Sequence, residues 1–253
     1  MLRKGDLTQG GITGTLLHFT LPMMVGSFLQ QCYNIADTLI VGQCIGAGAL
    51  AAVGSAYTLM VFLISVLLGL TMGSGTVFSL HYGAGNHVAL RRSIFSSFVL
   101  IGIVTLILNV AVFIWIDPIL QLLQVPQDIY GMMRSYLWII FCGIVFTFIY
   151  NFYASLLRAV GDSVTPLWFL AVSVVLNIAL DLFFILQLDW GIQGAAAATV
   201  LAQGVAALGI IIYTYRRRPE LRWHHEDMCF DRTCLKEIAS FSTLTCIQKS
   251  VMN

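Results

Sequence analysis

SIFSSFVLIGIVTLILNVAVFIWI, residues 93–116, is the stretch that decides the fold, because it contains no Asp, Glu, Lys or Arg. A helix needs about 20 consecutive apolar residues to cross the hydrocarbon core of a membrane, and this stretch is long enough. Charge-free windows also occupy residues 38–90, 135–157 and 190–215. Over the whole chain 58% of residues are hydrophobic and only 10% are charged, whereas soluble domains average about 25% charged residues. The composition excludes a soluble protein and predicts an integral membrane protein.

The spacing of the apolar runs predicts an all-α membrane protein, a bundle of six transmembrane helices. Backbone polar groups in lipid must be satisfied within the chain, and long uninterrupted apolar runs favour helices over the alternating strands of a barrel. Connectors such as GQCIGAG, HYGAGN and DPILQLLQVPQD separate the runs and contain residues typical of turns. We expect the helices at residues 15–41, 51–80, 93–116, 131–157, 164–188 and 191–215.

The basic residues outside the apolar runs predict the orientation in the membrane. They precede the first span and follow the second, fourth and sixth spans. They are Arg3, Lys4, Arg91, Arg92, Arg158, Arg216, Arg217, Arg218 and Arg222. The other connectors contain Asp117, Asp128 and Asp189, and Arg134, just inside the fourth span, is the single basic residue near them. By the positive-inside rule we expect a multi-pass protein of the plasma (inner) membrane with its N-terminus in the cytoplasm.

The composition along the chain predicts three segments. Residues 1–218 form a six-helix N-terminal lobe, and residues 219–237 form a polar cytoplasmic linker. Residues 238–253, IASFSTLTCIQKSVMN, are amphipathic and too short to span a membrane. Because many transporters consist of paired repeats, we expect this last segment to be the truncated first helix of a second, related lobe. On this interpretation the chain is a fragment of a two-lobed protein.

Two acidic residues, Asp37 and Asp181, lie within the predicted spans. A charged side chain at bilayer depth costs at least about 2.5–3.5 kcal/mol, so both are candidates for a functional site. Asn34 precedes Asp37 by three residues and Asn177 precedes Asp181 by four, so each pair shares one face of its helix. The alternative is that these polar side chains only hold helices together by hydrogen bonds.

The predicted topology places Asp37, Asp181 and Thr199 at the same depth, in the outer half of the bundle. Two carboxylates, the Asn177 amide and a hydroxyl form an oxygen-rich set suited to a hard cation such as Na+. In that case Asp37 and Asp181 would be the metal ligands, and the same carboxylates could instead take up a proton. Gln30 and Tyr33 continue the polar stripe on the first span, and Pro22 is either a packed kink or a bending point.

Three stretches resemble the multidrug and toxic compound extrusion (MATE) transporters. They are LLRAVGDSVTPLWFLAVSVVLNIALDLFFI (residues 156–185), YNIADTLIVGQCIGAGALAAVG (33–54) and GAGNHVALRRSI (83–94). Their order and spacing match the N-terminal lobe of that family and the start of its second lobe.

The resemblance implies one lobe of a two-lobed, inverted-V antiporter that exports organic cations in exchange for Na+ or H+. Such a protein is not an enzyme and uses no cofactor beyond the coupling ion. Its partners are the lipid bilayer, small organic cations and the C-terminal lobe, and not nucleic acid. The residues that match the family's functional positions are Asp37, Asn177, Asp181 and Thr199 for cation binding, Tyr136 and Pro22 for coupling, and Gln30, Tyr33 and Asn34 for the drug chamber.

Two other functions are weighed against the antiporter. A lipid-linked oligosaccharide flippase of related architecture would be expected to place arginines in its chamber to bind a pyrophosphate, and only Arg134 comes near the membrane interior. An intramembrane aspartyl protease would use two aspartates as a dyad and needs a Tyr-Asp and a Gly-x-Gly-Asp motif. Asp37 follows Ala36, however, and the Gly161–Asp162 pair is preceded by Ala159 and Val160.

Overall fold

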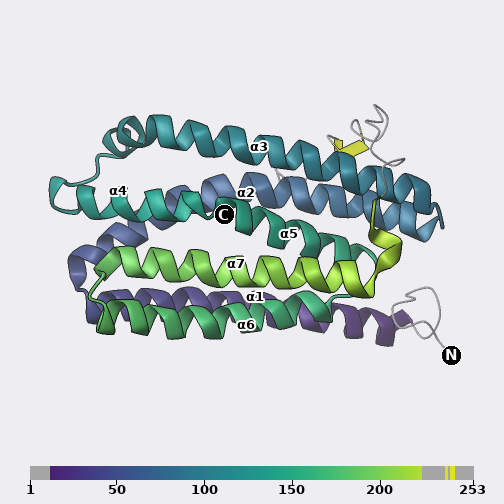
Figure 1. The fold of residues 1–253 in the computed structure, drawn as a ribbon, viewed down its shortest axis with the longest axis horizontal. Coiled ribbons are helices and arrows are strands. Elements are labelled where there is room, and N and C mark those ends of the chain that lie inside the picture. The colour runs from purple at the N-terminus through teal and green to yellow at the C-terminus, as the bar shows by residue number, and fades with distance from the viewer. Residues whose placement is uncertain (1–11, 224–236, 239, 243–253) are drawn as a thin grey trace.

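The computed structural model describes residues 12–223, 237–238 and 240–242. Within these residues the chain is helical and contains no β-strand, which confirms the all-α prediction (Figure 1). The elements are α1 (Ile12–Cys44), α2 (Ala47–Gly83), α3 (His87–Leu122), α4 (Gln127–Cys142), α5 (Ile144–Ala159), α6 (Val164–Leu182), the π-helical turn η1 (Phe183–Gln187), α7 (Gly191–Arg217) and the 3-10 turn η2 (Pro219–Leu221).

The helices form one antiparallel bundle in which α4 and α5 lie end to end at the centre (Figure 1). This pair packs against α2 on one side and α7 on the other. Beyond α2 lies α3, and beyond α7 lie α6 and α1, which pack along each other. The connectors α1–α2, α3–α4 and α6–α7 therefore share one end of the bundle, and α2–α3 and α5–α6 share the other (Figure 1).

Most of the helices have the length and composition of membrane spans. Among the described residues α2, α3, α7 and the combined α6–η1 segment each qualify alone, and the bent pair α4–α5 qualifies as one further span. The first helix, α1, is 33 residues long but is not in this group. It includes the polar run from Gln30 to Asp37, which lowers its hydropathy. With α4–α5 counted as one span, the arrangement agrees with the predicted six-helix lobe.

The span expected at residues 131–157 is present but is not one continuous helix, because it breaks at Gly143 and bends by 47°. At Gly143 a side chain would overlap Val200 of α7, so the two backbones approach closely there. Beside the break, Asn109 Nδ2 of α3 donates a hydrogen bond of 2.9 Å to the carbonyl oxygen of Phe141. Polar partners of this kind are what a broken helix needs at membrane depth.

The predicted connector at residues 117–128 is mostly helical. α3 continues to Leu122 and includes Pro118, and α4 already begins at Gln127. Proline removes one backbone donor from a helix, and here it lies in the last turns of α3. The connector itself is therefore restricted to residues 123–126.

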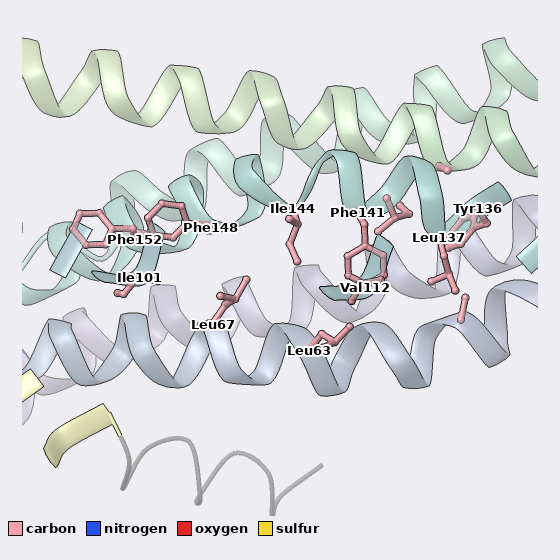
Figure 2. Packing of buried hydrophobic residues seen from close by; sticks show 14 of the residues in the cluster. Leu63, Leu67, Ile101, Val112, Tyr136, Leu137, Phe141, Ile144, Phe148 and Phe152 are labelled. Atoms are coloured by element: carbon pink, nitrogen blue, oxygen red, sulfur yellow. The ribbon is translucent and has the colours of Figure 1, made fainter. Parts of the chain in front are cut away.

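The apolar core follows the central α4–α5 pair, as Figure 2 shows for side chains from α2, α3, α4 and α5. Aromatic rings dominate its α5 half. The Phe152 ring lies 5.8 Å from Phe78 of α2 and 5.2 Å from Phe98 of α3, in edge-to-face contacts. Such pairs add stability beyond their buried area and fix α5 against both neighbours.

The predicted linker and second lobe fall mainly outside the described residues, so the domain boundaries stay predictions. The described start of the linker folds back on the lobe: Trp223 packs its ring 5.6 Å from Phe98. Arg218 lies 3.7 Å from Asp162 in the α5–α6 connector. Beyond the gap, the described residue Ile238 is buried against Val77 of α2.

Candidate functional site

Asp37 of α1 and Asp181 of α6 meet inside the bundle, where they are 8% and 0% exposed. Their carboxyl groups lie within interaction distance of each other. The Oδ1 atom of each is buried and has no hydrogen-bond partner among the described residues. The acids thus face one another, and two acceptor oxygens remain available to a cation.

Asn177 connects the aspartate pair to α7. It lies one helical turn before Asp181 and is 0% exposed. In the amide orientation that satisfies both neighbours, Nδ2 donates to Asp181 Oδ2 at 2.9 Å and Oδ1 accepts from the Thr199 backbone N–H at 3.2 Å. An amide atom also lies 3.3 Å from Thr199 Oγ1. The interpretation that Asn177 and Asp181 act from one helical face is consistent with these contacts.

Tyr33 and Tyr136 complete what we call the polar cluster. The Tyr33 hydroxyl lies 3.2 Å from Thr199 Oγ1. Tyr136 of α4 is 4% exposed and lies near Asp37, Tyr33 and Asp181. The members of the polar cluster are Tyr33, Asp37, Tyr136, Asn177, Asp181 and Thr199.

The polar cluster draws on α1, α4, α6 and α7, and its chemistry fits a hard cation or a proton. Its donors are oxygens of carboxyl, amide and hydroxyl groups, which bind hard cations well. Among the described residues no group of three or more His, Cys, Asp or Glu side chains comes together. A cation at this position would therefore need neutral oxygens beside the two acids. The orphaned Oδ1 atoms of Asp37 and Asp181 are the strongest sign of a cation position.

The other residues predicted on the first span lie outside the polar cluster. Asn34 is half-buried and donates to Gln31 Oε1 at 3.1 Å, so it turns to a neighbour on α1. Gln30 is exposed. Pro22 is half-buried inside α1, which continues through it as one helix. Of the three predicted drug-chamber residues, the structure joins Tyr33 alone to the polar cluster.

A second polar contact beside the cluster was not predicted. Thr147 of α5 donates to Gln203 Oε1 of α7, and Asn151 donates to the Thr147 carbonyl oxygen at 2.8 Å. A cavity of about 30 Å³ lies between these helices and α2, and Thr147, Thr199 and Gln203 provide its polar lining. Gln203 follows Thr199 by four residues, and that spacing is the sequence signal that could have identified it.

Comparisons with known proteins identify the family of this chain. The family model MatE matches residues 22–183. The chain is 36% identical over 217 residues to the probable multidrug resistance protein YpnP of Bacillus subtilis, covering 86% of this chain and 49% of that protein. It is 30% identical over 202 residues to the multidrug export protein MepA of Staphylococcus aureus (strain NCTC 8325), covering 78% of this chain and 44% of that protein.

Solved structures show the same fold. The outward-facing conformation of a multidrug resistance MATE family transporter superimposes with a TM-score of 0.91 at 24% identity, over 98% of this chain and 55% of that one. An inward-facing conformation gives a TM-score of 0.82 over 93% of this chain and 53% of that one. The chain spans about half the length of the curated relatives it matches. It therefore belongs to the MATE family and has the fold of one lobe of these transporters.

Proposed function

We propose that this chain is the cation-binding lobe of a secondary active multidrug antiporter, which exports organic cations in exchange for Na+ or H+. The observation that carries the proposal is the buried Asp37–Asp181 pair with its two unpartnered oxygens. The relatives are named as multidrug resistance and multidrug export proteins, which supports an organic drug as the exported substrate. We further propose the plasma (inner) membrane as the location, with the N-terminus cytoplasmic.

The exchange requires only that the cation and the drug prefer different states of the lobe. Two ionised aspartates in contact repel each other, so an added proton or Na+ stabilises the closed polar cluster. Without the cation, the pair favours a state in which a cationic drug supplies the missing positive charge. Tyr33 contacts Thr199 in the polar cluster and lies on the same helix as Gln30 and Asn34, so it is placed to connect cation and drug sites.

The remaining roles extend this proposal. Tyr136 couples α4 to the charge of the aspartates, and Pro22 gives α1 a position with one backbone hydrogen bond fewer, where it can bend. Gln30 and Asn34, which lie outside the polar cluster, are proposed to contact the drug. The second lobe is proposed as the partner that completes the central cavity.

The test uses the full-length protein that carries this lobe, reconstituted in liposomes with ethidium as the organic cation. We expect Asp37→Asn and Asp181→Asn each to lower efflux driven by an imposed Na+ or proton gradient by about tenfold or more, because each removes one acid of the coupling pair. The matched control is Asp189→Asn, in the α6–α7 connector, where φ is 53° and Asn is well tolerated. Undiminished uphill efflux by both variants would contradict the proposal.

The alternative functions gain no support from the geometry. The arginine that a flippase would use, Arg134, is bound in a bidentate ion pair with Asp117. The matching family and the solved neighbours are transporters, not proteases.

A further inference from the structure

Arg134 of α4 is held by an ion pair that the proposed exchange mechanism does not use. Its Nε donates to Asp117 Oδ1 at 2.7 Å and its NH2 group donates to Oδ2 at 3.2 Å. The Tyr130 hydroxyl donates to the same Oδ1 at 2.9 Å. The guanidinium also lies 6.0 Å from the ring centre of Trp138. Asp117 belongs to α3, so this group ties the outer end of α3 to α4.

The helix that Arg134 holds is a separate half-span. α4 ends at Cys142, and the 47° bend at Gly143 separates its direction from that of α5 (Figure 1). Its inner end is anchored by the hydrogen bond from Asn109 to Phe141. In the N-terminal half of α4, the Arg134–Asp117 ion pair links it to α3. The two contacts therefore link α4 to α3 on both sides of its midpoint.

The tilt of α4 matters because the helix carries Tyr136 into the polar cluster. Arg134 and Tyr136 are two residues apart, which places them roughly 200° apart around the helix. Arg134 is accordingly half-exposed and paired with Asp117 of α3, while Tyr136 is 4% exposed and lies near Asp37 and Asp181. Figure 2 shows Tyr136 and Leu137 on α4 beside the core. A change of tilt or rotation at Arg134 therefore moves Tyr136 relative to Asp37 and Asp181.

We infer that Arg134 is a positioning residue for the cation site. Through Asp117 and Tyr130 it fixes α4 so that the Tyr136 hydroxyl stays in the polar cluster and supports the cation-bound state. Breaking the Arg134–Asp117 pair leaves Asp37 and Asp181 unchanged and lowers the affinity of the site for the cation. The inference rests on the proposed function, since it assigns Arg134 a role in the cation step of that exchange.

The experiment measures cation dependence in two ways on the purified full-length protein. One is the Tm as a function of Na+ concentration at fixed pH and of pH without Na+, because a ligand that binds the folded state raises Tm. The other is ethidium efflux from liposomes against the imposed cation gradient. The variants are Arg134→Gln, Asp117→Asn, their combination, and Arg134→Gln in a Tyr136→Phe background. Asp128→Asn, in the first turn of the same helix α4, is the charge-matched control.

We expect each single variant to raise the cation concentration for half-maximal response by about fivefold. The double variant is expected to have the same half-maximal cation concentration as either single variant, because Arg134 and Asp117 act as a unit. In the Tyr136→Phe background, Arg134→Gln is expected to give no further shift. Arg134→Lys keeps the positive charge but cannot make the two parallel hydrogen bonds to Asp117. Its half-maximal cation concentration is expected to lie between those of the unaltered protein and Arg134→Gln. Asp128→Asn is expected to resemble the unaltered protein.

Other results separate the inference from the proposed function. An unchanged cation response in Arg134→Gln, or an equal shift with and without Tyr136, overturns the positioning role, because a merely structural pair would lower Tm at every cation concentration alike. A cation-dependent Tm with the expected pattern but without gradient-driven ethidium efflux overturns the antiport proposal and retains the positioning role. No cation-dependent Tm in the unaltered protein overturns both.

Discussion

Thr199 is the residue at which three helices meet. Its hydroxyl lies 3.2 Å from the Tyr33 hydroxyl of α1 and 3.3 Å from the Asn177 amide of α6, and Thr199 itself belongs to α7. A hydroxyl can donate one hydrogen bond and accept two, so it can serve both neighbours and still offer a lone pair to a cation. Its position explains why a residue without charge belongs to the polar cluster.

Thr199→Val tests that role, because valine has nearly the same shape and lacks the hydroxyl. Leaving buried polar partners unsatisfied costs about 1–3 kcal/mol, so we expect the half-maximal cation concentration for efflux to rise roughly tenfold. Thr214→Val is the matched control: Thr214 is a buried threonine of the same helix whose hydroxyl donates to the Ile210 carbonyl at 2.8 Å. Equal effects in the two variants would show that Thr199 only supports the helix.

Individual residues of the site were predictable where their chemistry is rare in lipid. Asp37 and Asp181 stand out because a buried acid is costly, and the structure brings them into contact. Thr147 and Gln203 were missed because neutral polar residues are common in membrane helices and give no such signal. The direction of Asn34, toward Gln31, depends on local side-chain geometry that sequence spacing does not specify.

The break between α4 and α5 is the feature at the scale of elements that shapes the bundle. The residues around it, Cys142, Gly143 and Ile144, contain no proline, and the surrounding run is apolar, so the sequence resembles a continuous span. The break is explained by a contact with a distant residue, since Gly143 lies against Val200 of α7. Conversely, Pro118 is typical of a connector and lies inside α3 because it falls near the helix end.

Gly143→Ala tests the close approach at the break. A Cβ at this position would lie 2.8 Å from Val200 Cγ1 and closer still to Cγ2, so the helices must separate. We expect a destabilisation of about 1–3 kcal/mol, typical of overpacking, seen as a lower Tm of the purified protein. Adding Val200→Ala is expected to restore part of the loss. Gly131→Ala, within α4, is the control, because no described atom lies within 4 Å of a Cβ there.

The lobe as a whole follows the alternation of charge along the chain. Arg91, Arg92 and Arg158 lie in helix ends next to the α2–α3 and α5–α6 connectors, whereas Asp117, Asp128 and Asp189 lie in or next to the connectors at the opposite end of the bundle (Figure 1). The number of spans and the end of the bundle at which each connector lies were predictable, because both depend on span length and on the positions of charged residues and not on long-range contacts. The packing order, with α4–α5 between α2 and α7, depends on side-chain fit and did not follow from the sequence.

Orientation is tested by labelling single cysteines in a variant that lacks the six native ones. Ala84→Cys lies in the α2–α3 connector and Leu123→Cys in the α3–α4 connector, and both positions are exposed. From the positive-inside rule, we expect a membrane-impermeant maleimide to label residue 123 in intact cells and residue 84 only after permeabilisation. The reverse pattern would invert the proposed topology.

The π-helical turn η1 at the end of α6 sets a constraint on chain length near the site. Such a turn holds one residue more than an α-helical turn, and η1 begins two residues after Asp181. The ring of Phe184 in this turn stacks 5.1 Å from Trp190, and its Cβ lies 3.0 Å from the position that a Cβ on Gly194 would occupy. Deleting one residue from 183–187 would return the turn to α-helical winding and rotate the downstream residues by about 100°. The buried acid would keep its place, while the start of α7 would lose its register with α6.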